Sequence, residues 1–204
     1  SATRLYATLE YGDRVECFEC IPLLADKLLQ SSDAQVREIS AWWLRKRSFG
    51  FGPIMVKMQK VVVEDADPER RARAAAALGE FLDPHGAPTL SQVAKDDAEA
   101  SVRAAAVRAL GRLNVLTGHA ALSRALGDAD ASVRKAALEQ VLKVNFFSDD
   151  SALLGTLADD EAAVRSTAAQ LVGELRLTSA VEPLLGVIMT DDSSGGASGA
   201  FVLN

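Results

Sequence analysis

The sequence is poor in the residues from which catalytic and metal sites are usually built. Its 204 residues include two histidines and two cysteines, and only 5% are aromatic. It contains no phosphate-binding G-x-x-x-x-G-K-[ST] loop, no G-x-S-x-G turn and no H-E-x-x-H pair. We therefore expect a protein that is not an enzyme, with no cofactor and no bound metal.

Long apolar runs are also lacking. No stretch of 18 apolar residues occurs, so no membrane-spanning helix is expected, and no signal-peptide core is present. We expect a soluble protein of the cytoplasm or the periplasm, and the oligomeric state stays open. Leu, Val and Ala dominate without the alternation typical of strands, which predicts an all-α fold.

What the chain does contain is a repeated pair of an acid and an arginine four residues apart. It occurs five times, and successive arginines lie 34, 32, 31 and 31 residues apart. An apolar Leu or Val follows each arginine seven residues later. Self-similarity at this period predicts a solenoid of stacked units. The pairs are Asp33/Arg37, Asp67/Arg71, Glu99/Arg103, Asp130/Arg134 and Glu161/Arg165.

A second series with the same period marks another helix in each unit. Leu24, Met58, Leu90, Leu122, Leu153 and Leu185 recur at 31 to 34 residues, and proline precedes three of them by two positions. Proline favours the first turn of a helix. Each unit is therefore predicted to be a first helix (A), an acidic turn and a second helix (B), with a final A helix alone.

The acidic turns predict where the B helices begin. Asp33, Asp67 and Asp130 are good N-caps, because a short carboxylate accepts the free N–H groups of the first turn. Glu99 and Glu161 are poorer caps, so we expect Asp97 or Asp160 to share that role there. Each repeat arginine lies within reach of the acid four residues before it. Gly79, Gly111 and Gly173 are expected where the B helices end.

The strings DADPERRARAAAALGEF, DAEASVRAAAVRALGRL and DADASVRKAALEQVL resemble HEAT repeats, and in particular the short HEAT-like repeats of the phycocyanobilin lyases. The resemblance covers residues 17–192. It implies a right-handed α-solenoid of about five helical hairpins and a terminal half-repeat. The expected domain is 1–192, with repeats near 17–47, 51–81, 85–113, 118–144 and 150–176 and a half-repeat at 180–190. Residues 193–204 are expected to be a flexible Gly/Ser-rich tail, or alternatively to dock Phe201-Val202-Leu203 on the last helix.

Charge is distributed unevenly over these units. The net charge is −6, yet the acids crowd into the A–B turns. In such a solenoid the B helices would line the concave side, and positions one, five, eight and nine after each repeat arginine would face outward. Basic residues outnumber acids in that set, which favours an acidic peptide or protein as partner and leaves nucleic acid as an alternative. The outward set includes Glu38, Trp42, Arg45, Lys46, Glu80, Arg108, Arg112, Lys135, Glu139 and Lys143.

Trp42 interrupts a column of small and polar residues. We expect it to be either exposed as a binding anchor or covered by the helix formed by residues 1–10, whereas Trp43 is expected in the core. Trp and Arg are the usual anchors of interfaces. Our candidate partner-binding residues are Trp42, Arg45, Arg73, Arg108 and Arg112.

Cys17 and Cys20 form a C-x-x-C pair at the start of the first A helix. Ile21 follows where a c-type haem site needs His, and His85 and His119 lie in later repeats, which disfavours zinc. A local disulfide and two reduced thiols both remain open.

These observations together predict a non-enzymatic scaffold that binds a protein or peptide. The alternatives are a nucleic-acid-binding solenoid and a subunit of a phycobilin-lyase-like complex, the latter implied by the resemblance alone.

Overall fold

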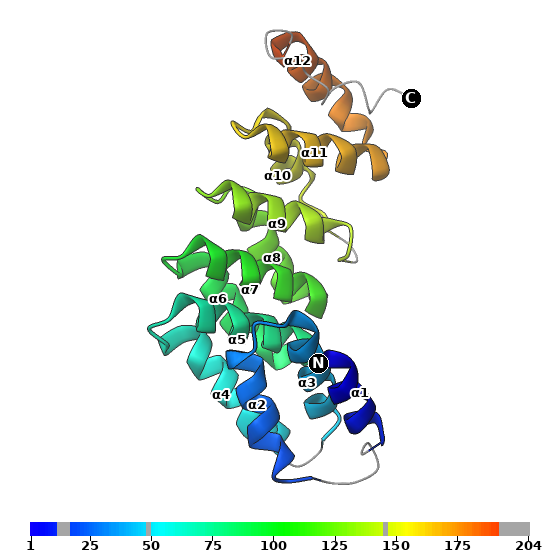
Figure 1. The fold of residues 1–204 in the computed structure, drawn as a ribbon. Helices are drawn as coiled ribbons and strands as arrows, with labels where there is room; N and C mark the ends of the chain where they lie inside the picture. The colour runs from blue at the N-terminus through cyan, green and yellow to red at the C-terminus, as the bar shows by residue number, and fades with distance from the viewer. Residues whose placement is uncertain (12–16, 48–49, 145–146, 192–204) are drawn as a thin grey trace.

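The structure is a computed structural model, and it describes residues 1–11, 17–47, 50–144 and 147–191. Throughout these ranges the regular elements are helices, stacked in one elongated array (Figure 1). The chain is an α-solenoid, as predicted. Helix α1 (Ala2–Tyr11) comes first, and five hairpins follow: α2 (Cys20–Gln30) with α3 (Ala34–Arg45), α4 (Phe51–Glu64) with α5 (Pro68–Glu80), α6 (Ala87–Asp96) with α7 (Ala100–Leu113), α8 (Leu116–Ala125) with α9 (Ala131–Val141), and α10 (Asp150–Gly155) with α11 (Ala162–Glu174).

A single A helix, α12 (Val181–Asp191), follows the last hairpin. Leu185 of this helix is 42% exposed, whereas Leu24, Met58, Leu90, Leu122 and Leu153 of the same series are buried. In every earlier unit a B helix covers that position, so α12 has the exposure expected of a half-repeat. The predictions about residues 193–204, including docking of Phe201-Val202-Leu203, lie outside the described residues.

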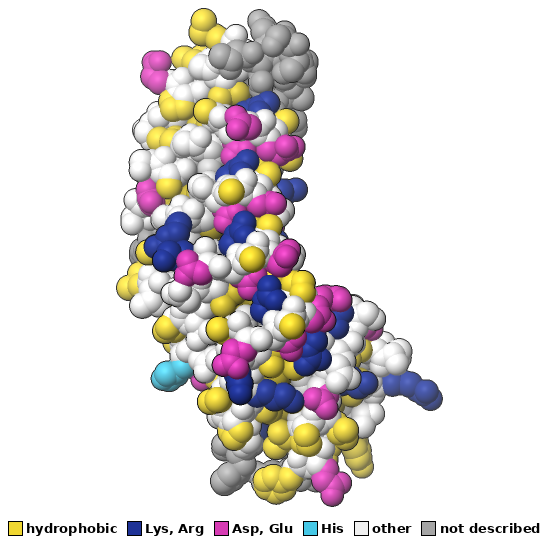
Figure 2. All heavy atoms as spheres, turned by 90° about the vertical axis from the view of Figure 1, so that its left-hand side faces the viewer, with side chains coloured by type: hydrophobic (Ala, Val, Ile, Leu, Met, Phe, Trp, Pro, Cys, Tyr) yellow, Lys and Arg dark blue, Asp and Glu magenta, His cyan; other side chains and the backbone are white. Residues whose placement is uncertain are grey.

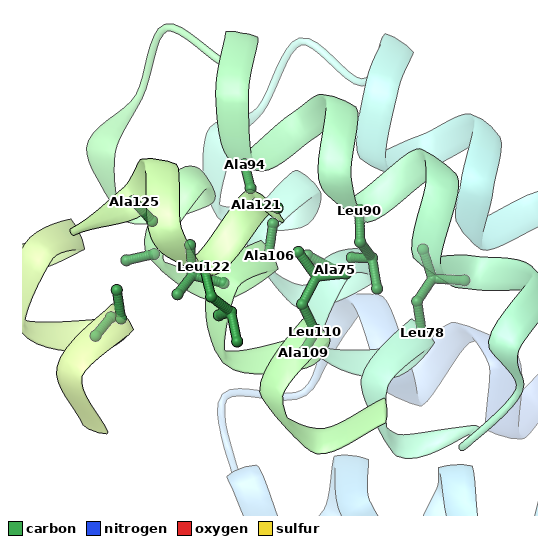
Figure 3. Packing of buried hydrophobic residues seen from close by; sticks show 14 of the residues in the cluster. Ala75, Leu78, Leu90, Ala94, Ala106, Ala109, Leu110, Ala121, Leu122 and Ala125 are labelled. Atoms are coloured by element: carbon green, nitrogen blue, oxygen red, sulfur yellow. The ribbon is translucent and has the colours of Figure 1, made fainter. Parts of the chain in front are cut away.

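The core lies between the A and B helices of neighbouring units. Its larger side chains come from the two predicted series, such as Leu78 and Leu110 from B helices and Leu90 and Leu122 from A helices (Figure 3). These four are at most 1% exposed. Alanines such as Ala106 fill the positions between them and let the helices approach closely.

The predicted caps of the B helices are confirmed for Asp33, Asp67 and Asp130, whose carboxylates accept first-turn N–H groups. Glu99 and Glu161 make no such side-chain bond.

The shared capping role falls to Asp97 and Asp159, which accept the N–H groups of Glu99 and Glu161 at 2.9 Å. Asp97 was predicted for this role, but Asp160 was the wrong choice in the last unit. The aspartate two residues before the cap position forms the local turn, because a short carboxylate reaches the backbone two residues on.

Among the described residues, the guanidinium groups of Arg71, Arg103 and Arg134 form no hydrogen bond with the acid four residues before them. Instead Arg71, Arg103 and Arg134 each donate through Nε and Nη2 to an aspartate of the next unit, at 2.6 to 2.9 Å. Their acceptors are Asp97, Asp128 and Asp159. Nη1 of each arginine donates to a backbone carbonyl of its own turn, at 2.8 to 2.9 Å. We call this series the Arg–Asp ladder; basic and acidic side chains alternate along the turn edge in Figure 2.

The ladder begins only after the first unit. Arg37 donates to the carbonyl of Ser31, and Asp65 accepts from Arg70 instead, with 2.8 Å between Nε and the carboxylate. The first two units are joined by arginines that reach backbone carbonyls. Arg73 donates to Leu29 at 2.9 Å and Arg45 donates to Glu80 at 3.0 Å.

Two glycines set the distance between neighbouring B helices. A Cβ added to Gly79 would lie 2.8 Å from the Cα of Ala109, and one added to Gly111 would lie 2.6 Å from the Cβ of Gln140. Both glycines lie in the last turn of their helices, one and two residues before the final helical residue, as expected where the B helices begin to end. Their role is close packing, for which the missing side chain is required.

We predict that Gly79→Ala destabilises the fold by about 1–3 kcal/mol, because its new methyl would collide with backbone atoms that cannot rotate away. Gly155→Ala is the matched control, since nothing lies within 4 Å of its Cβ position. The control is expected to be neutral or slightly stabilising, as alanine favours helix over glycine. Urea unfolding of the two variants measures the difference, and equal midpoints would contradict this packing role.

The Arg–Asp ladder predicts a loss of stability in acid. Burial alone would raise the pKa of Asp97, Asp128 and Asp159, but hydrogen bonds from the arginines and the turn N–H groups lower it below 3.8. A carboxylate whose pKa is lower in the folded state stabilises fully above the unfolded value, and that contribution is lost as pH falls through the folded pKa. Stability should therefore begin to fall as the pH drops to about 4, and the loss should continue until these carboxylates are protonated in the folded protein.

Asp128→Asn tests this assignment. It should cost roughly 1–3 kcal/mol at neutral pH, because Arg103 loses its charged acceptor, and it should make the acid loss shallower. Glu64→Gln, at an exposed pair with Lys60, is the control and should change little. Thermal melts across pH measure both variants, and an unchanged acid profile for Asp128→Asn would refute the assignment.

Candidate partner-binding groove

A hollow of about 460 Å³ lies on the outward side of α5, α7 and α9, which we call the B-helix groove. Its apolar lining consists of alanines, and its polar lining carries three cations and one carboxylate. The lining residues are Ala76, Glu80, Ala105, Arg108, Ala109, Gly111, Arg112, Asn114, Gln140 and Lys143.

The charged residues of the groove occupy equivalent positions in successive repeats. Glu80, Arg112 and Lys143 each lie nine residues after a repeat arginine, and Arg108 lies five after Arg103. Positions five and nine are four apart, which places them on one face of a helix. The residue seven positions after the arginine points into the core instead. One helical period therefore places an apolar side chain in the core and the charged side chains of positions five and nine in the groove.

Arg112 is held by two carboxylates of preceding repeats. Its Nη2 lies 2.8 Å from the carboxylate of Glu80 and 3.7 Å from that of Glu38. Burial raises the pKa of Glu80, and nearby Glu38 adds to that rise, while Arg112 and Arg45 oppose it. The groove thus already holds one partly buried carboxylate beside a guanidinium.

Arg108 and Lys143 behave differently. Both are exposed, and within the described part of the chain neither side chain forms a hydrogen bond or an ion pair. Their charges point into the groove opening without compensation from a bonded acid. An incoming anion can therefore pair with them without first breaking a contact of the protein.

The structure brings two of the five predicted binding residues, Arg108 and Arg112, into the groove. Arg73 is 16% exposed at its side chain, ion-paired with Glu69 and bonded to the carbonyl of Leu29. Arg45 is half-buried and bonded to the carbonyl of Glu80. Arg73 and Arg45 join the first two repeats, and neither lines the groove.

Trp42 is half-buried because α1 packs beside it. The ring of Tyr6 lies 5.7 Å from the ring of Trp42, and Lys46 Nζ lies 3.9 Å from its centre. Of the two predicted positions, cover by the N-terminal helix is the one observed. Trp43 is 1% exposed, which confirms its place in the core.

Two groove residues were missed by the sequence reasoning. Asn114 ends α7 in the left-handed conformation, with φ of 48°, and asparagine after a helix is a known signal for it. Gln140 is 3% exposed against Gly111. Its role depends on the approach of two helices, which a single repeat does not reveal.

Cys17 and Cys20 are joined by a disulfide at the entry to α2. The structure thereby selects one of the two states that the sequence left open. Among the described residues no group of three or more His, Cys, Asp and Glu side chains gathers as metal ligands would. In the same ranges, every helix is too short or too polar to cross a membrane.

Comparison with known proteins agrees with this architecture. Residues 56–143 match the family model of HEAT repeats. Its fold is similar to the X-ray structure of YibA of Escherichia coli, with 18% identity and a TM-score of 0.60 over 90% of this chain and 68% of that one. An engineered protein matches at 19% identity and a TM-score of 0.51, over 88% of this chain and 92% of its own.

The complex of CpcE and CpcF of phycocyanin lyase from Nostoc is a further neighbour, at 20% identity and a TM-score of 0.40, covering 90% of this chain and 92% of that one. A similarity of that size carries no argument about pigment chemistry. No curated protein sequence matches the chain.

We predict that Trp42→Ala lowers stability by about 2 kcal/mol or more, because it removes the aromatic surface on which α1 packs. Tyr6→Ala should lose part of the same packing, and the double variant should cost less than the sum of the single ones. Urea unfolding measures all three. Strictly additive losses would show that Tyr6 and Trp42 do not support each other.

Proposed function

We propose that this α-solenoid is a non-enzymatic scaffold that binds a protein or peptide partner at the B-helix groove. The observation that carries the proposal is the hollow across α5, α7 and α9, with Arg108 and Lys143 exposed in its lining. Arg112 lines the same hollow and is the third basic residue of the proposed surface.

The frame around the groove supports this use. The Arg–Asp ladder bonds α5 to the turn before α7, and α7 to the turn before α9, through two hydrogen bonds at each step. Gly79 and Gly111 allow the same helices to approach closely. The helices that carry the binding residues are thus already ordered, so docking of a partner does not have to order their backbone.

Nucleic acid is the competing partner, because three cations also suit phosphates. Glu38, Glu80 and Glu139 lie on the same side of the B helices and would repel a phosphate backbone. The net charge of −6 opposes it as well. A protein or peptide partner can space its carboxylates to meet the cations and place other residues beside those acids, whereas a nucleic acid carries a phosphate at every nucleotide.

Affinity capture tests the proposal. The wild-type protein should retain a partner from nuclease-treated extract of its source. The Arg108→Glu variant should retain about tenfold less of that partner, or still less, since arginine is a frequent interface anchor. Lys60→Glu, a charge reversal on the exposed side of α4, should retain it. Circular dichroism would confirm that both variants remain helical.

Two results would refute the proposal. One is capture that survives Arg108→Glu unchanged. The other is capture that disappears after nuclease treatment and falls steeply with salt, as expected when several phosphate contacts release counterions.

A further inference from the structure

The carboxylate of Glu80 occupies the B-helix groove in the free protein. Its side chain is 20% exposed and touches Arg112 at 2.8 Å, while Arg108 and Lys143 of the same groove have no bonded acid in the described chain. The groove lining therefore carries three cations and one carboxylate, and that carboxylate is paired with Arg112. Glu38 is more distant, at 3.7 Å from Arg112.

We propose that the groove recognises a short acidic peptide strand, and that Glu80 holds in the free protein the place that a ligand carboxylate takes in the complex. The proposal rests on the proposed function and names the chemistry of the partner. Two ligand carboxylates pair with Arg108 and Lys143, and a third competes with Glu80 for Arg112.

The energetics of Glu80 support the exchange. Burial disfavours the charged form of this side chain and raises its pKa, so its carboxylate stays there largely because of the guanidinium beside it. Arg112 is itself half exposed, with 49% of its side chain accessible. A ligand carboxylate can thus approach from the open side and take over the ion pair with this arginine, while Glu80 turns toward solvent.

The dimensions of the groove fit a strand of this kind. Packed helices lie about 8–10 Å apart, so three successive B helices span roughly 20 Å. An extended chain covers about 3.3–3.6 Å per residue, so about six residues bridge α5 to α9. Ala76, Ala105 and Ala109 leave the floor low, which admits a backbone with small side chains between the acids.

Other classes of ligand fit less well. An amphipathic helix needs pockets for large apolar side chains, and alanine and glycine are the apolar residues of this lining. A nucleic acid carries a phosphate at every nucleotide, so it would also bring phosphates close to the carboxylates of Glu38, Glu80 and Glu139. A peptide can instead space its carboxylates to match Arg108, Arg112 and Lys143.

The test uses a fluorescein-labelled peptide of alternating Asp and Ala, eight residues long, and the full chain with its disulfide intact. Fluorescence anisotropy at low salt should show that this peptide binds. An Asn/Ala peptide of the same length should bind with an affinity at least about tenfold lower. Arg108→Gln should lower the affinity for the Asp/Ala peptide by at least about fivefold. Lys60→Gln on α4 should leave its affinity unchanged.

The decisive variant is Glu80→Gln. Removing the internal carboxylate releases Arg112, so affinity for the Asp/Ala peptide should rise about threefold or more, within the range measured for partly exposed ion pairs. Glu38→Gln should change affinity in the same direction and by less, because Glu38 is 61% exposed and 3.7 Å away. Thermal melts would verify folding, and Glu38→Gln keeps the test valid if Glu80→Gln unfolds.

The outcomes separate this inference from the proposed function. Equal affinity for the Asp/Ala and Asn/Ala peptides would overturn the acidic class, even if Arg108→Glu still abolishes partner capture. Weaker or unchanged binding by both Glu80→Gln and Glu38→Gln would overturn the competitor role of Glu80. If an eight-nucleotide single strand binds more tightly than the Asp/Ala peptide and its binding depends on Arg108, both the peptide class and the scaffold proposal would be overturned.

Discussion

The arrangement of the molecule depends on one bidentate bond, between a repeat arginine and the turn aspartate of the following unit. Each aspartate on this ladder does two things, since it also closes its own A–B turn by accepting a backbone N–H group. The orientation of each B helix is thus tied to the turn that starts the next one. Partial burial of these charges is tolerated because the arginine's donors and the carboxylate's acceptors are bonded on several sides.

The same bonding divides the structure into regions that are held by different kinds of contact. From α5 to α9, ladder bonds and glycine contacts act together, and there the groove has its fixed outline. The first unit is held by arginines to backbone carbonyls and by α1 against Trp42. Residues that looked like binding anchors in the first unit are therefore needed for its packing.

The sequence alone predicts much of the fold because each unit repeats a local signal. The caps at Asp33, Asp67 and Asp130 and the buried leucine series follow from helix periods and turn chemistry. What it does not predict are contacts between units. The partners of Arg71 and Arg73 and the approach of Gln140 to Gly111 depend on how helices stack, which no single period encodes. For Trp42 the sequence offers cover by the N-terminal helix as one of two positions but does not decide between them. The outward positions of Arg108 and Arg112 could be predicted because they follow from the period of a single helix.

The ladder joins residues of different units at an almost constant offset, 25 or 26 positions along the chain. Removing or duplicating one full period would present an equivalent aspartate to the arginine left behind. The same arginine–aspartate bond can therefore form whatever the number of units in the array. Array length, and with it the reach of the exposed surface, can change by whole modules through simple duplication of coding sequence, without a new junction having to arise.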